Sequence, residues 1–307
     1  MDLLSIVLPK LKREYIKWRY YQAARRIHRT RPLGQGTLPF ILLSMVQKRD
    51  VVPYLVAVKS FAQHANPHRV VVICDPSIDQ NDRKTFHKHV PHIELRDASE
   101  FTDARIPRGG TWERLLAIAN YASDNYVVQL DSDTVTIRPI PEVVDSIVNG
   151  TAFVLGGEPN ERLMTLAQTF QLAKAIKVSW GKIQELAELK MIELDRPRDE
   201  KYVRGCSGFT GFPRSAAMEE KLFTYSAEMR NLIGDRWVEW GTEQVTSNYL
   251  VANSKGVVIL PDKKYGTPNY ATGDMAFFHF IGYTHYADTK YEITSRQVIN
   301  ALHTVSA

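Results

Sequence analysis

Two aspartates one residue apart, Asp131 and Asp133, come directly after the apolar segment Tyr126–Leu130. A short apolar run of this kind is typical of a strand that is buried on both faces of a sheet. Ligands of open α/β sheets bind beyond the carboxyl ends of the strands. Carboxylate oxygens suit Mg²⁺ or Mn²⁺, which can act as a Lewis acid on a phosphoryl leaving group. The pair therefore predicts a divalent-metal site, although Asp and Ser also favour a plain strand-end turn.

Three further segments carry side chains that can take part in the same chemistry. His279 ends another short apolar segment, where an imidazole can complete a metal site or form a structural hydrogen bond. Glu243 and Gln244 begin a predicted helix, where they can position a reacting sugar, or where the acid can simply complement the helix dipole. Arg114 lies on the helix before the Asp131 strand and can bind phosphate, pair with an acid or remain solvated.

Strands and helices alternate along the first half of the chain. We expect strands over residues 38–46, 69–74, 92–95 and 126–130, and helices over residues 52–64, 79–89 and 111–123, the last capped by Thr111. The alternation predicts an α/β fold with a mixed, mostly parallel sheet flanked by helices. Further on we expect strands over 151–155, 257–260 and 276–280, strand and turn over 202–214, and helices over 161–189, broken near Gly181, and 240–252.

Length and composition agree with an ordinary globular protein. The chain has 307 residues, of which 44% are hydrophobic and 24% charged, so disorder and coiled coil are poor descriptions of the whole. Its two cysteines, Cys74 and Cys206, cannot build a disulfide framework. No apolar run approaches the roughly 20 residues that cross a bilayer, and no secretory signal is evident. We therefore expect a reduced, cytoplasmic protein.

Positive charge is concentrated in residues 1–31. This segment has nine Lys and Arg residues against two acids, a net charge of +7, whereas the whole chain has a net charge of +5. Aromatic residues are interleaved with the charges, and Trp18, Arg25 and Arg26 are candidates for contact with an anionic membrane surface. The alternatives are a solvated helix that packs on its own domain and, less favoured, an RNA-binding arm. No nucleic-acid partner is expected, and the first possibility predicts peripheral association with the inner face of the membrane.

Taken in order along residues 38–286, these features resemble a GT-A nucleotide-sugar glycosyltransferase, most nearly family 8, the glycogenin and galactosyltransferase type. The resemblance is most specific at Leu130–Asp133 and His279–Gly282. With the basic helical arm over residues 1–31 set apart, it implies a single Rossmann-like GT-A domain over 32–307. Within that domain it implies a nucleotide-binding half over 38–150 and an acceptor-binding half over 151–307.

The resemblance also implies roles for individual residues. It makes Asp131 and Asp133 a metal pair for Mn²⁺ or Mg²⁺, with His279 as the third protein ligand. It places Gln244 near the anomeric carbon of the donor and Glu243 near the sugar hydroxyls. The residues implied to contact the donor are Asp50, Tyr54, Asp75, Arg114, Ser132, Cys206, Ser207, Gly208, Gly282 and His285.

This sequence departs from the family pattern at three places. Cys206 stands where the family has Asn, and Val245 stands where it has a second Asp. The family follows His-Phe-x-Gly with Lys-Pro-Trp, whereas this chain has His285–Ala287. A protonated His285 can take the role of that Lys beside the diphosphate.

The resemblance implies transfer of a sugar from a nucleoside-diphosphate donor, UDP being favoured, to a saccharide or lipid-linked acceptor. Retention of configuration follows if Gln244 lines the donor, and inversion follows if Glu243 acts as a general base. One alternative is a haloacid-dehalogenase-type phosphatase with Asp131 as nucleophile and a loose second acidic motif at Asp235 and Glu239. The other is a module that binds the nucleotide sugar without turnover.

Overall fold

The computed structural model describes residues 3–175, 182–195 and 199–304. The strands of its main sheet lie in the order β10-β6-β9-β4-β1-β2-β3. All neighbouring pairs are parallel except the two made by β9, which runs antiparallel to both β4 and β6. The predicted α/β class with a mixed, mostly parallel sheet is confirmed.

The main-sheet strands are β1 (Leu38–Val46), β2 (Pro67–Cys74), β3 (Ile93–Asp97), β4 (Tyr126–Leu130), β6 (Phe153–Gly156), β9 (Gly205–Phe212) and β10 (Val258–Ile259). Shorter strands are β5 (Thr134–Thr136), β7 (Met164–Thr165), β8 (Lys201–Tyr202), β11 (Tyr265–Gly266) and β12 (Phe277–His279). The α-helices are α1 (Leu3–Ala24), α2 (Val51–Ala65), α3 (Gln80–His89), α4 (Trp112–Ala122), α5 (Pro141–Asn149), α6 (Leu166–Ala175), α7 (Ile183–Lys190), α8 (Met218–Ile233), α9 (Thr242–Ala252) and α10 (Lys290–Thr304).

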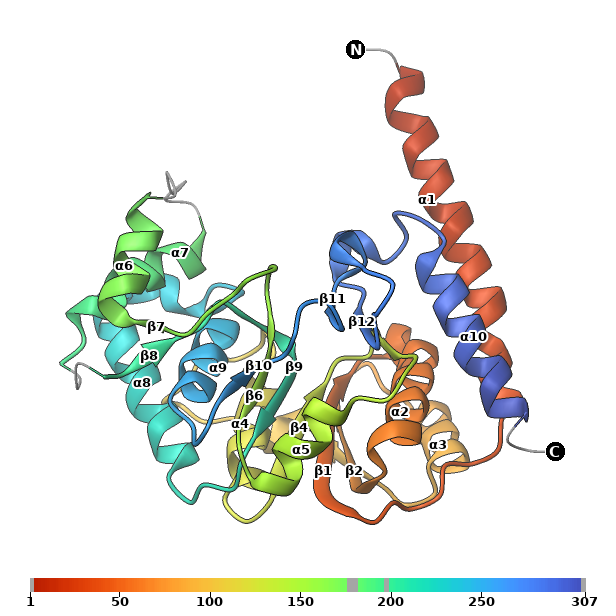
Figure 1. The fold of residues 1–307 in the computed structure, drawn as a ribbon, viewed down its shortest axis with the longest axis horizontal. Coiled ribbons are helices and arrows are strands. Elements are labelled where there is room, and N and C mark those ends of the chain that lie inside the picture. The colour runs from red at the N-terminus through yellow and green to blue at the C-terminus, as the bar shows by residue number, and fades with distance from the viewer. Residues whose placement is uncertain (1–2, 176–181, 196–198, 305–307) are drawn as a thin grey trace.

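Both faces of the main sheet are covered, as the continuous apolar strands predict. Successive side chains of a strand point to opposite faces, so Leu42 and Leu43 of β1 belong to two different hydrophobic clusters. One cluster joins the sheet to α2, α5 and α10, and the other joins it to α4, α8 and α9. Figure 1 shows these helices on the two sides of the sheet.

A smaller sheet lies beside the carboxyl end of β4. Its strands are ordered β11-β12-β5, and β12 runs antiparallel to β5. Only Asp131–Asp133 separate β4 from β5, and the register places His279 opposite Thr134. The two motifs that are far apart in sequence therefore meet at one edge of the fold.

The N-terminal helix α1 packs along α10 (Figure 1). Ile16, Tyr20 and Ala23 are buried in this contact, while Trp18 stays exposed. No helix among the described residues is long and apolar enough to cross a membrane.

Some local predictions differ from the structure. Thr111 precedes α4 but makes no capping hydrogen bond, because its backbone is left-handed, with φ of 76°, and its hydroxyl bonds to Gly110. The segment expected to be helical from residue 161 begins as β7, since Met164 pairs with Tyr202 of β8. Residues near Gly181, where a helix break was expected, lie outside the described residues. Within the predicted strand and turn at 202–214, Tyr202 ends β8 and Gly205–Phe212 form β9.

Candidate functional site

Asp131, Asp133 and His279 come together at the carboxyl end of β4. One oxygen or nitrogen ligand atom from each lies within 4.8 Å of the others. The Nε2 atom of His279 is 3.0 Å from Asp133 Oδ1 and 3.7 Å from Asp131 Oδ2. Two carboxylates and an imidazole form a donor set that fits Mn²⁺ and, through the carboxylates, Mg²⁺. In the described part of the chain, no other group of three such residues converges in this way.

Strand β9 fixes the back of this cluster. The amide of Asp131 donates to Gly208 O at 2.8 Å, and a Cβ on Gly208 would lie 2.1 Å from His279 Cε1. Glycine is therefore required for the imidazole to approach the strand. The thiol of Cys206 lies 3.1 Å from His279 Nδ1, the ring nitrogen that faces away from Asp133. Cys206, predicted to contact the donor sugar, thus contacts His279.

Electrostatics differ between the two aspartates. Burial raises the pKa of Asp131, and the nearby Arg114 opposes that rise without cancelling it. Burial also acts to raise the pKa of Asp133, but His279 and His285 outweigh it and hold that pKa below its ordinary value. Burial would lower the pKa of His279, yet Cys206 and Asp133 raise it well above its ordinary value. A cation that binds here must displace the His279 proton, so its affinity increases with pH.

Arg114 links three elements of the site. Its guanidinium, on α4, donates to Asp131 beyond β4 and to Glu243 Oε1 of α9, the latter at 3.1 Å. The side chain is only 5% exposed, and that of Glu243 only 3%. Arg114 was predicted to contact the donor, and in the structure it donates to Asp131, where it orients one metal-ligand candidate. Its two carboxylate partners raise its pKa against the effect of burial.

The first turn of α9 holds the two residues predicted to act on the sugar. Glu243 is enclosed by Arg114 and by the hydroxyl of Ser207, which lies 3.5 Å from its Oε2. Burial raises the pKa of Glu243, with Arg114 opposing the rise. Gln244 faces a groove instead, and its amide donates to Gly205 O at 3.1 Å. The two neighbours therefore have different environments, one closed and one open.

The loop after β12 brings a second imidazole to the cluster. The Nε2 atom of His285 lies 2.8 Å from Asp133 Oδ2, and its side chain is 27% exposed. Gly282, in the same loop, is exposed, and Ser132 is half-buried between the two aspartates. Asp50 lies in the loop that follows β1. Burial raises the pKa of Asp50, and the charge of the nearby Asp133 raises it further.

A cavity of about 460 Å³ is lined by Thr111, whose hydroxyl oxygen accepts from Arg114 at 3.4 Å. Asp75, which follows β2, lines it together with Gln47 and the turn Gly109–Thr111. The Oδ1 atom of Asp75 accepts from the amide of Ser77 at 2.9 Å, which fixes the turn after the strand. The prediction for Tyr54 is wrong in this structure. Its ring is fully buried in the core and packs edge-on against Phe86, because α2 begins at Val51 and turns this position inward.

A larger groove, of about 890 Å³, is lined by Gln244. Trp240 lines it and is 74% exposed, although the sequence indicated only a helix start there. Glu161 also lines it, and burial raises the pKa of this carboxyl to about 7. No sequence motif distinguishes Glu161 as a candidate site residue. It lies in the β6–β7 loop, which is held beside the groove by its contact with Arg204.

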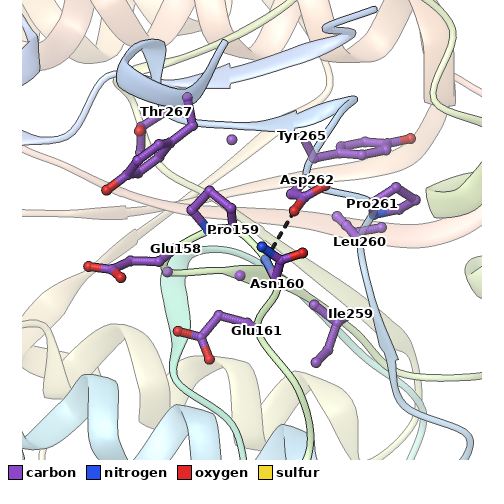
Figure 2. A pocket seen from close by; sticks show the side chains of 14 residues that line it. Glu158, Pro159, Asn160, Glu161, Ile259, Leu260, Pro261, Asp262, Tyr265 and Thr267 are labelled. Atoms are coloured by element: carbon purple, nitrogen blue, oxygen red, sulfur yellow. Dashed lines mark hydrogen bonds between the residues drawn. The ribbon is translucent and has the colours of Figure 1, made fainter. Parts of the chain in front are cut away.

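The groove is adjoined by a smaller cavity of about 210 Å³ (Figure 2). Glu158 and Glu161 line both, and Figure 2 shows their carboxylates on the same side of the cavity. The backbone N–H of Asn160 donates to Asp262 Oδ2 at 3.0 Å, which joins the β6–β7 loop to the loop after β10. Together the cavities form a continuous surface beside Gln244.

Comparison with known proteins identifies the fold. No family model and no curated protein matches the sequence. The crystal structure of the galactosyltransferase LgtC with donor and acceptor sugar analogues is 14% identical, over 84% of this chain and 95% of LgtC, with a TM-score of 0.54. An active-site mutant of LgtC gives 13% identity over the same shares and a TM-score of 0.54. The bifunctional glycosyltransferase WbbM is 15% identical over 87% of this chain, with a TM-score of 0.51, and the chain spans about half of it, 52%. The chain therefore has the fold of GT-A glycosyltransferases.

Proposed function

We propose that this protein is a metal-dependent glycosyltransferase of the family 8 type, which transfers a sugar from a nucleoside diphosphate to a saccharide or lipid-linked acceptor. The convergence of Asp131, Asp133 and His279 at the carboxyl end of β4, within a GT-A fold, carries this proposal. Ligand sites of open α/β sheets lie at that end of the strands. The fold and the donor set thus support the same site.

The donor fits a position between the cluster and the cavity that Asp75 lines. The nucleoside, for which we favour uridine on the resemblance to family 8, would occupy the cavity. The diphosphate would lie over Asp131 and Asp133, which with His279 would hold Mn²⁺ or Mg²⁺. When bound, the cation supplies positive charge that stabilises the departing diphosphate.

The protein's own residues then have separate tasks. His285, partly exposed next to Asp133, would donate a hydrogen bond to the diphosphate in place of the family's Lys. Arg114 donates a hydrogen bond to Asp131 and so keeps its carboxylate oriented. Ser207 and Gly208 line the strand on which the donor sugar would rest.

The environments of Glu243 and Gln244 support retention of configuration. A general base must reach the acceptor hydroxyl, directly or through one water. Glu243 is 3% exposed and engaged by Arg114 and Ser207, so it is poorly placed for that task. Gln244 faces the open groove and would lie near the anomeric carbon. We therefore infer that Glu243 positions Arg114 and that Gln244 faces the reacting centre.

The acceptor fits the groove beyond Gln244. The exposed indole of Trp240 offers a flat apolar face against which a sugar ring can pack, and Glu161 offers an acceptor for its hydroxyls. The phosphatase alternative is not favoured, since Arg114 engages Asp131 and the second acidic motif lies elsewhere. In that motif Glu239 pairs with Arg236 at 2.6 Å.

The proposal is tested by incubating the protein with UDP-, GDP-, CDP- and dTDP-sugars and measuring release of the nucleoside diphosphate with and without Mn²⁺. We expect release from one base class, dependent on Mn²⁺ and lost in Asp133→Asn. Asp235→Asn is the matched control and should release diphosphate at the wild-type rate. Hydrolysis of p-nitrophenyl phosphate that depends on Asp235, without release from any nucleotide sugar, would contradict the proposal.

A further inference from the structure

Helix α1 has two faces of opposite character. Its inner face packs on α10 through the buried side chains of Ile16, Tyr20 and Ala23. The N-terminal part of the helix projects past α10, on the side of the molecule where β12 lies (Figure 1). The packing on α10 agrees with one of the alternatives that the sequence left open, a helix that packs on its own domain, and it leaves the outer face of α1 exposed.

The outer face carries an apolar stripe. Leu8, Leu11, Tyr15 and Trp18 follow one another at spacings of three, four and three residues, so they share one side of the helix. Each is between 58% and 61% exposed. The rings of Tyr15 and Trp18 stack with centroids 6.1 Å apart and extend the stripe as a flat surface. An exposed contiguous apolar surface of this kind marks an interaction site.

Basic side chains surround the stripe. The exposed basic residues on α1 and in the turn that follows it include Lys10, Lys12, Lys17, Arg25 and Arg26. Within the ranges that the structure describes, none of these five forms an ion pair. The only acid in the α1 sequence is Glu14. An apolar stripe with Trp and Leu, bordered by unpaired cations, is complementary to a surface of anionic headgroups over acyl chains.

The inner face of α1 connects this surface to the predicted donor site. Tyr20 stacks on Tyr291 of α10 with ring centroids 4.1 Å apart, and Tyr291 stacks on His285 at 5.9 Å. Arg19 pairs with the buried Glu292 at 2.9 Å, and Arg13 donates to Gly282 O at 3.4 Å. A surface that binds α1 is therefore held in a fixed relation to the loop that carries His285.

We propose that α1 docks the protein on an anionic membrane surface, with Leu8, Leu11, Tyr15 and Trp18 inserted between headgroups and the surrounding Lys and Arg residues bound to lipid phosphates. The helix lies on the bilayer and does not cross it, in keeping with its alternation of apolar and basic residues. Docking brings the His285 loop, and with it the candidate site, to the membrane.

Cosedimentation of the full chain with lipid vesicles tests this. We expect binding to phosphatidylcholine vesicles that contain phosphatidylglycerol and little binding to phosphatidylcholine alone. Because each basic residue near the surface adds about fivefold in affinity, added salt should weaken binding strongly. Leu11→Glu with Trp18→Glu should abolish it. Val238→Glu, at a residue that is 63% exposed between α8 and α9, is the matched control and should bind like the wild type.

Three results would overturn the proposal. Equal binding of the wild type and the Leu11→Glu, Trp18→Glu variant would show that the stripe is not the contact. A wild type that ignores both vesicle types yet forms dimers in multi-angle light scattering, lost in the same variant, would assign the stripe to a second copy of the chain. Retention on an RNA column without vesicle binding would likewise assign the basic residues to nucleic acid. None of these measurements depends on catalysis, so they stand apart from the glycosyltransferase proposal.

Discussion

At Asp133 a single carboxylate lies between two imidazoles, with Oδ1 facing His279 and Oδ2 facing His285. The first imidazole is buried against β9, and the second belongs to an exposed loop. One side of the carboxylate thus faces an imidazole packed on the sheet, and the other faces an imidazole of a partly exposed loop. We infer that His279 belongs to the permanent site and that His285 exchanges Asp133 for the donor.

The contact between Gly208 and His279 gives a prediction at this scale. In Gly208→Ala the new methyl group would overlap the imidazole, so His279 or β9 must move. We expect a loss of about 2 kcal/mol in the free energy of unfolding and weaker Mn²⁺ binding. Gly34→Ala is the control, because a Cβ there meets nothing within 4 Å. Urea denaturation measures the first effect, and calorimetric Mn²⁺ titration the second; wild-type values for both in Gly208→Ala would contradict the packing described.

At the scale of elements, the buried Arg114 joins α4 to α9 through an ion pair with the buried Glu243, and to the end of β4 through an ion pair with the partly exposed Asp131. Removing the guanidinium leaves the carboxylate of Glu243, which is only 3% exposed, and that of Asp131, which is 27% exposed, without their partner. For Arg114→Met we expect a loss of about 3 kcal/mol in the free energy of unfolding. Arg214→Met removes a guanidinium that is 71% exposed and 3.8 Å from Asp124, so we expect a change below about 0.5 kcal/mol. Equal urea midpoints for the two variants would refute this account of α4.

The contact between α3 and the segment that follows α1 predicts that the stability of the fold depends on pH. The segment after α1 contacts α3 where His28 Nδ1 lies 3.3 Å from His89 Nε2, and Lys59 lies 3.3 Å from the other ring nitrogen of His89. Burial, aided by Lys59, lowers the pKa of His89 to about 4. Between its ordinary pKa and 4 the unfolded chain binds a proton that the folded chain does not, so stability falls as pH falls.

We therefore expect the free energy of unfolding to decrease by about 1–3 kcal/mol between pH 7 and pH 4.5 because of this residue. The measurement is urea denaturation at several pH values, comparing the wild type with His89→Gln. The variant keeps polar atoms at the site and removes the titration, so its stability should change less with pH over this range. Parallel pH profiles for the two proteins would show that His89 does not contribute.

For the molecule as a whole, the strands that matter most for the site were readable from sequence. Residues 38–46 and 126–130 were predicted with the bounds that β1 and β4 have, because continuous apolar runs buried on both faces leave little ambiguity. The order of the strands, and the antiparallel insertion of β9 between β4 and β6, depend on contacts between distant segments that no local pattern encodes.

The same distinction applies to the candidate site. Asp131 and Asp133 were accessible to prediction because they directly follow an apolar strand, and His279 because it ends one. The position of Cys206 behind His279 and the burial of Tyr54 were not, since each depends on how an element faces its neighbours. Trp240 was overlooked for a related reason: sequence shows an aromatic residue but not whether its ring faces solvent.

The most direct test of the central claim is calorimetric titration of UDP into the protein with and without Mn²⁺, using the wild type, Asp133→Asn and the control Asp235→Asn. The account predicts Mn²⁺-dependent UDP binding in the wild type and in Asp235→Asn, and none in Asp133→Asn, because the carboxylate that faces both imidazoles is lost. UDP binding that is the same with and without Mn²⁺, or unchanged in Asp133→Asn, would contradict a metal-assisted donor site at the end of β4.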